Sequence, residues 1–243
     1  MKKQIVKPDA IFFDLDDTIS SFDSVCDTAW YQCCQNYIEK YKSSFTYEEL
    51  RKSIDETKRW YWADPVRHKE GRENLREARR DVVRFSLDTL GISDEKQVVE
   101  LADDYTALQD SLLALLPGSL EALERLKEAG VRMAVITNGA SPVQREKLQR
   151  FKITEYFEKV IIDSEVGYSK PDRKIFEYAL KEMKLIPSQV WMIGDNLVWD
   201  VGGAKQLGIF SVWNDYKKKG LPKNCDIIPD LIVSSIYELS LMI

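Results

Sequence analysis

The stretch AIFFDLDDT, residues 10–18, joins a short apolar run directly to an acidic one. Four consecutive apolar residues, Ala10 to Phe13, are typical of a strand that is buried on both faces. The acidic residues that begin at Asp14 end this run abruptly, as happens where a buried strand opens into a polar loop. The stretch therefore predicts a parallel strand with a candidate functional site at its carboxyl end.

Similar apolar runs recur along the rest of the chain and are mostly separated by segments with helical periodicity. Strands that alternate with helices predict an α/β fold built on a parallel sheet. The expected strands after the first cover residues 131–136, 160–162, 190–193, 209–213 and 231–233.

Residues 21–116 break this alternation, because they contain long amphipathic patterns and no convincing strand. We expect a helical insert here, with residues 1–20 and 117–243 forming the α/β core. Pro65 and Gly71 punctuate the insert, and Pro117-Gly118 marks the return to the core. The expected helices lie near residues 23–41, 46–62, 72–90 and 94–115.

Composition and charge exclude several classes of protein. The 243 residues, 44% of them hydrophobic, suit a globular core with a smaller insert. A formal net charge of -5 gives no overall basic field for nucleic acid. No apolar run reaches the roughly 20 residues of a membrane helix, and Met1 to Lys7 lack the apolar stretch of a secretory signal. We therefore expect a cytoplasmic protein that binds neither nucleic acid nor membrane.

Cysteine and histidine usage argues against a zinc site. The four cysteines form no CxxC pair, and His68 is the single histidine. Cys33 and Cys34 share helical spacing with Trp30 and Tyr37, so we expect them to pack within an apolar stripe.

Polar clusters follow four of the expected strands. Because open α/β sheets bind ligands beyond the carboxyl ends of their strands, these clusters should converge. Their carboxylates suit a hard divalent cation such as magnesium, and their hydroxyl, amide and lysine groups suit phosphate. The clusters are DLDDT at 14–18, TNG at 137–139, SKPD at 169–172 and GDNLVWD at 194–200.

In this order the clusters resemble the four motifs of the haloacid-dehalogenase-like hydrolase superfamily, and the resemblance spans nearly the whole chain. It implies a doubly wound, Rossmann-like core with an inserted helical cap. It also implies a magnesium-dependent phosphatase in which Asp14 attacks the phosphorus of a small phosphate ester. A carboxylate is a weak enough base to remain ionised near neutral pH and can act as such a nucleophile.

The resemblance assigns roles to the remaining motif residues. Asp16 would be the general acid and base, while Thr137 and the Asn138 backbone would bind phosphoryl oxygens. Lys170 would bind the substrate and offset charge during transfer. The magnesium ligands would be the Asp14 carboxylate, the Asp16 backbone carbonyl and Asp195. Asp200 would more readily orient waters or Lys170 than bind the ion directly.

Other functions remain open at this point. A dehalogenase of the same superfamily would usually lack the second aspartate, so Asp16 favours phosphate chemistry. A phosphomutase is a further alternative, as is a noncatalytic protein that retains the fold. Arg72, Arg76 and Trp60 of the insert are candidates for substrate contact, although a solvated basic face is the simpler interpretation of the arginines. The residues indicate neither a natural substrate nor an oligomeric state.

Overall fold

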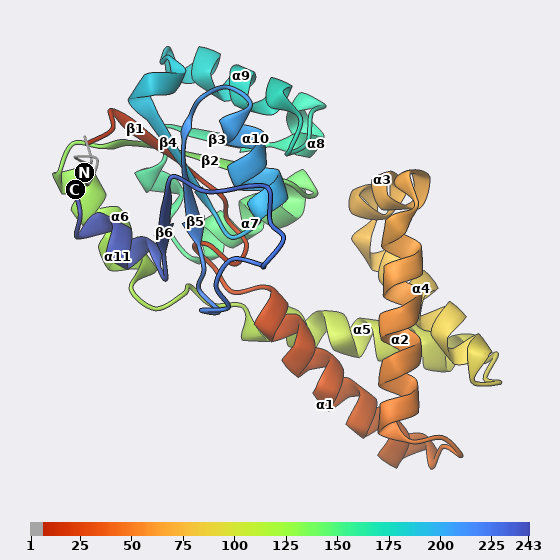
Figure 1. Ribbon diagram of the computed structural model, residues 1–243. Coiled ribbons are helices and arrows are strands. Elements are labelled where there is room, and N and C mark those ends of the chain that lie inside the picture. The colour runs from red at the N-terminus through yellow and green to blue at the C-terminus, as the bar shows by residue number, and fades with distance from the viewer. Residues whose placement is uncertain (1–6) are drawn as a thin grey trace. The chain divides into compact units, whose positions relative to one another are not determined.

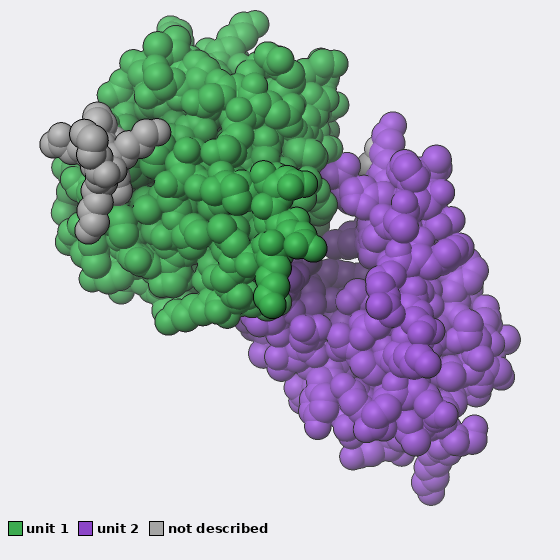
Figure 2. All heavy atoms as spheres, viewed as in Figure 1, with its two compact units in different colours: residues 1–21, 114–243 green, residues 22–113 purple. Residues whose placement is uncertain are grey.

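The computed structural model describes residues 7–243, apart from the side chain of Glu73. The described chain forms two compact units, coloured separately in Figure 2. One unit comprises residues 7–21 and 114–243, and the other comprises residues 22–113. Most of the Met1–Lys7 segment, on which the expectation of no secretory signal rests, lies outside the described residues. No helix within residues 7–243 is both long and apolar enough to cross a membrane.

The first unit is built on a six-stranded parallel sheet in the order β3-β2-β1-β4-β5-β6 (Figure 1). This confirms the predicted α/β fold and its doubly wound topology, since β1 lies at the centre between β2 and β4. Ala10 pairs with Arg132 on one side and with Val190 on the other. The strands are β1 (Ala10–Phe13), β2 (Arg132–Thr137), β3 (Lys159–Ile162), β4 (Val190–Gly194), β5 (Phe210–Asn214) and β6 (Leu231–Val233).

Helices cover both faces of this sheet. Alternation along β1 directs Ile11 and Phe13 to one face, where they join a core cluster with residues of α6 (Ser119–Glu128), α7 (Ser141–Arg150) and α11 (Ile236–Ser240). Ala10 and Phe12 join a second cluster with α9 (Arg173–Met183) and α10 (Gly203–Lys205) on the opposite face. The strand is therefore buried on both sides, as its uninterrupted apolar sequence predicted.

Short elements complete the loops at the carboxyl edge. They are α8 (Asp163–Val166), which follows β3 directly, and a π-helical turn, η3 (Leu197–Gly202), after β4. The remaining single turns are η1 (Thr154–Tyr156) and η2 (Pro187–Gln189). Asp172 caps α9 by accepting a hydrogen bond from the Lys174 backbone at 2.9 Å.

The second unit is wholly helical over residues 22–113. Its core includes the buried Cys33 and Cys34, and the Trp30 and Tyr105 rings stack at 3.7 Å between centroids. The predicted apolar stripe of α1 is thus confirmed. The helices are α1 (Asp23–Tyr41), α2 (Tyr47–Ala63), α3 (Pro65–Glu73), α4 (Leu75–Thr89) and α5 (Glu95–Leu112).

One helix in this unit differs from the sequence-based expectation. Residues 65–73 form a separate helix, because Asp64 caps its start and Pro65 suits a first-turn position. The next helix starts at Leu75, where the Asn74 side chain accepts a hydrogen bond from the Glu77 backbone. The helix expected over residues 72–90 is therefore divided at Asn74.

Candidate active site

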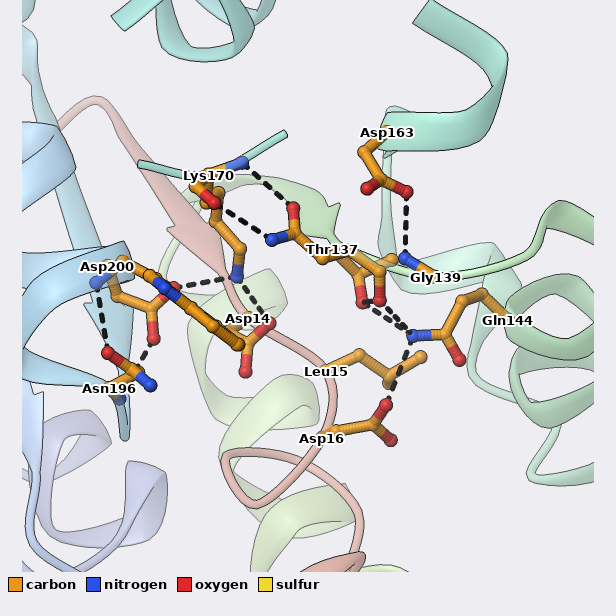
Figure 3. A network of polar contacts seen from close by, with 12 residues as sticks. Asp14, Leu15, Asp16, Thr137, Gly139, Gln144, Asp163, Lys170, Asn196 and Asp200 are labelled. Atoms are coloured by element: carbon orange, nitrogen blue, oxygen red, sulfur yellow. Dashed lines mark hydrogen bonds and ion pairs between the residues drawn. The ribbon is translucent and has the colours of Figure 1, made fainter. Parts of the chain in front are cut away.

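The four predicted clusters meet at the carboxyl edge of the sheet (Figure 3). Asp14 follows β1 directly, Thr137 is the last residue of β2, and Asp195 follows β4. Because β1 pairs with β2 and β4 in parallel, these three strand ends lie side by side. Lys170 enters from the loop between α8 and α9.

Lys170 is a buried cation placed between two carboxylates. Its Nζ donates to Asp14 Oδ1 at 2.5 Å and to Asp200 Oδ1 at 2.6 Å, and the residue is only 4% exposed. Burial by itself would lower the pKa of the Lys170 ammonium, but the two carboxylates raise it above its ordinary value. Lys170 therefore remains charged beside the Asp14 carboxylate.

The Lys170 backbone is fixed by Asn138. The Asn138 side chain donates from Nδ2 to the Lys170 carbonyl at 3.0 Å and accepts from the Lys170 N–H at 2.9 Å. Asp163 joins the same two loops, because its carboxylate accepts from the Gly139 N–H at 2.7 Å and from Ser169 Oγ at 2.8 Å. The loops after β2 and β3 are thereby held in one arrangement around the lysine.

Asp200 is held just as firmly from the η3 turn. Its Oδ2 accepts from the Asn196 N–H at 3.0 Å, while the Asn196 side chain accepts from backbone groups at the start of the turn. A Cβ on Gly194 would meet Asp200 Oδ2 at 2.1 Å, so only glycine permits this close approach. Both Asp200 oxygens are thus already engaged within the protein.

Three carboxylates converge at this point. Oxygens of Asp14, Asp195 and Asp200 lie within 4.8 Å of one another. Burial raises the pKa of Asp14 to about 7, although Lys170 opposes this shift and Asp200 adds to it. Burial, followed by the charges of Asp14 and Asp200, raises the pKa of Asp195 to about 9. Such mutual repulsion favours a cation among them, and a set of oxygen donors alone fits magnesium.

A comparison with known protein families gives a match over most of the chain. A family model described as haloacid dehalogenase-like hydrolase matches residues 8–208, a range that includes all four clusters. The chain belongs to this family. It is a hydrolase, as the sequence predicted.

Relatives of this hydrolase include enzymes that act on phosphate esters. It is 28% identical over 235 residues to pyrimidine 5'-nucleotidase YjjG of Escherichia coli (strain K12), covering 96% of this chain and 97% of that protein. It is 32% identical over 212 residues to glyceraldehyde 3-phosphate phosphatase of Pyrococcus abyssi, and the match covers 86% of this chain and 82% of that protein. The solved structure of the putative HAD-hydrolase YfnB from Bacillus subtilis has the same fold, with a TM-score of 0.71 at 20% identity and coverage of 98% and 99%.

The Asp16 side chain contacts helix α7 rather than Lys170. Lys147 Nζ donates to Asp16 Oδ1 at 2.7 Å and to Oδ2 at 2.9 Å, and Gln144 Nε2 donates to Oδ2 at 3.1 Å. Gln144 Nε2 also contacts Thr137 Oγ1 at 2.7 Å. The structure therefore links the predicted acid to the predicted phosphate-binding threonine through α7 (Figure 3).

Sequence reasoning overlooked three polar residues of this hydrolase, namely Gln144, Lys147 and Asp163. A signal for the first two was present, since Gln144 and Lys147 share helical spacing with Leu148 on the face of α7 that packs into the core. A lysine on an apolar face requires a buried partner. Asp163 carried no comparable signal.

The arginines that form the predicted basic face of the helical unit contact a neighbouring helix. Arg76 and Arg80 both pair with Asp103 of α5, at 2.7 Å and 2.9 Å. Arg79 contacts Thr106 Oγ1 at 3.1 Å and also Gln109. These arginines join α4 to α5, so a structural role accounts for them.

The predicted aromatic candidate Trp60 remains on the surface of the helical unit. Its side chain is 48% exposed, and the Arg67 guanidinium stacks over its ring at 3.9 Å. Tyr61, by contrast, is buried in the helical core.

Proposed function

We propose that this hydrolase is a magnesium-dependent phosphatase that cleaves a small phosphate monoester through an aspartyl-phosphate intermediate. The observation that carries the proposal is the buried Lys170 ammonium, 2.5 Å from the Asp14 carboxylate. A fixed cation at this point can stabilise the charge of a phosphoryl group during transfer. The named phosphatase and nucleotidase activities of the relatives support the same class of substrate.

In the first half-reaction, a carboxylate oxygen of Asp14 forms a bond to phosphorus as the bond from phosphorus to the ester oxygen breaks. The departing oxygen takes a proton from the Asp16 carboxyl group and leaves as an alcohol. Thr137 and the Asn138 backbone bind phosphoryl oxygens. Lys170 contacts Asp14 throughout and balances the added negative charge.

In the second half-reaction, a water molecule attacks the phosphorus of the aspartyl-phosphate. Asp16, now ionised, accepts a proton from that water, and the bond from phosphorus to the Asp14 oxygen breaks. Inorganic phosphate leaves, and both carboxyl groups return to their starting states. A single residue thus serves as acid in one step and as base in the next.

The metal ligands in this proposal are the carboxylates of Asp14 and Asp195 and the backbone carbonyl of Asp16. Asp200 would act through Lys170, because hydrogen bonds from Lys170 and from the Asn196 backbone already occupy its two oxygens. Bound magnesium would neutralise converging carboxylate and phosphate charge and polarise the phosphoryl group.

We further propose that residues 21–116 serve as a cap that selects the substrate, with residues 1–20 and 117–243 as the catalytic core. A cytoplasmic phosphorylated metabolite, such as a nucleotide, a sugar phosphate or a small phosphorylated acid, fits this assignment. Exposed Trp60, with Arg67 stacked on it, is a candidate for substrate contact on the surface of the helical unit.

A panel of phosphate monoesters tests the proposal, with phosphate release measured with magnesium and again with a chelator. We expect turnover only with magnesium, and loss of both turnover and covalent phosphorylation in Asp14→Asn. Asp172→Asn is a matched control, because asparagine retains the ability to cap α9. Equal turnover without metal would overturn the magnesium requirement. Halide release from 2-haloacids without phosphate release would establish the dehalogenase alternative.

A further inference from the structure

Lys147 is an almost fully buried lysine whose ammonium lies against a residue of the active site. The residue is 3% exposed and lies on α7, in the helical face that also buries Leu148. Withdrawing an ammonium from water is costly unless a carboxylate compensates. Asp16 provides that compensation through both of its oxygens, at 2.7 Å and 2.9 Å.

The pairing constrains Asp16 more than it constrains Lys147. Asp16 lies on the loop after β1, and its side chain remains 24% exposed, whereas the Lys147 side chain is 4% exposed. A loop carboxylate with that exposure could adopt several rotamers, but donors from a packed helix contact both of its oxygens. Gln144, which is itself buried, adds a third contact to Oδ2 at 3.1 Å.

Gln144 also connects this carboxylate to the loop after β2. Its Nε2 lies 2.7 Å from Thr137 Oγ1 and 3.1 Å from the Asn138 carbonyl oxygen, in addition to its contact with Asp16. An amide nitrogen has two hydrogens for these three acceptors, so the contacts are shared. Helix α7 therefore fixes the acid relative to the residues that would bind the phosphoryl group.

From this geometry we infer that Lys147 is a positioning residue that, together with Gln144, holds Asp16 beside the reacting phosphoryl group. From that position, the proton that Asp16 takes from the attacking water in one turnover can pass to the leaving oxygen in the next. The inference rests on the proposed phosphatase function, in which Asp16 is the acid. Proton transfer requires the acid to lie within hydrogen-bond reach of the reacting oxygen, and a misplacement of about 1 Å can cost about a hundredfold in rate. Lys147 itself does not contact the substrate in this assignment.

The dependence of rate on the leaving group separates positioning from a purely structural role. An alkyl phosphate needs a proton as its alkoxide departs, whereas 2,4-dinitrophenyl phosphate has a leaving group that departs readily without one. We expect Lys147→Met to lower kcat/KM for the best alkyl phosphate by about tenfold to a hundredfold. The same variant should lower kcat/KM for the dinitrophenyl ester by less than about threefold.

Arg145→Met is the matched control on the same helix. It also removes a cation that is paired with a carboxylate, since Arg145 Nε lies 2.6 Å from Glu165 Oε1, but this pair is on the surface. We expect it to change kcat/KM for neither ester. Lys147→Gln retains a donor and should recover part of the loss. It also provides a second variant if Lys147→Met folds poorly, which thermal unfolding of each protein would reveal.

A double-mutant cycle identifies which assignment fails if the data disagree. In an Asp16→Asn background, Lys147→Met should cause little further loss with the alkyl ester, because the group that it positions is already gone. If Asp16→Asn does not impair the alkyl ester, the proposed acid is wrong. If Asp16→Asn impairs it while folded Lys147→Met and Lys147→Gln equal or exceed wild type, the inference about Lys147 is overturned and the proposed function stands. Equal losses with both esters would also overturn the inference.

Discussion

The carboxylate cluster should make the stability of the metal-free protein fall as pH rises, and Asp195→Asn should abolish most of that fall. Burial and the neighbouring Asp14 and Asp200 charges raise the pKa of Asp195 to about 9 in the folded protein. In the unfolded chain its pKa returns to the ordinary aspartate value of 3.8. Between these values the folded state binds the extra proton, so its stability decreases with increasing pH.

The magnitude follows from proton linkage. A full difference of one bound proton changes the free energy of unfolding by about 1.4 kcal/mol per pH unit. Between about pH 6 and pH 8, Asp195 alone would therefore remove up to about 3 kcal/mol, and solvent relaxation should reduce this to about 1–2 kcal/mol. Asp14, with its pKa raised to about 7, adds to the fall over the lower part of that range.

Urea unfolding at the two pH values, with a chelator or with saturating magnesium, measures this linkage. Magnesium must displace the Asp195 proton, so its stabilising effect should be larger at the higher pH in wild type and small in Asp195→Asn. Asp230→Asn is a control in which the pKa shift of the replaced carboxyl group has the opposite sign. Although partial burial opposes the shift, hydrogen bonds from Ser211 and the Lys205 ammonium lower the pKa of Asp230, so its loss should destabilise the protein independently of magnesium. An unchanged pH slope in Asp195→Asn would refute the reasoning.

Two further substitutions test close contacts. Gly194→Ala would place a Cβ 2.1 Å from Asp200 Oδ2, so we expect a loss of about 1–3 kcal/mol in the free energy of unfolding together with loss of turnover. Full stability and activity would show that Asp200 can move without consequence. Arg76→Ala should leave the ranking of a substrate panel unchanged, because Arg76 pairs with Asp103 in a contact between helices. A selective rise in KM for one substrate would instead place Arg76 in the substrate site.

Much of the sheet could be predicted because its strands have a direct sequence signal. A run such as Ala10 to Phe13 is apolar at every position because both faces of β1 are covered by helices. The helix boundaries near Asn74 were harder to predict. Arg72 and Leu75 fit one continuous helical pattern, and the division depends on capping by Asp64 and Asn74 side chains.

The candidate site was predictable only in part. Asp14 and Asp195 follow adjacent parallel strands, so their convergence follows from the topology. The Asp16–Lys147 pair depends on how α7 packs against the loop after β1, and no local pattern specifies that contact. Asn138 is a third case. The sequence indicated it as a site residue, but it did not indicate that the Asn138 side chain forms two hydrogen bonds with the Lys170 backbone.

The central position of β1 has a consequence for the order in which the protein can fold during synthesis. The ribosome produces this strand before the two strands that flank it, so both edges of Ala10 are paired only after Arg132 and then Val190 have been made. The core of the helical unit, by contrast, is made entirely of residues within 22–113. We therefore expect the helical unit to fold on the nascent chain while the AIFF segment still exposes apolar surface and unpaired backbone groups. The strand that precedes Asp14 would be made before its neighbouring strands and sheltered only after them, and would be a target for chaperones in between.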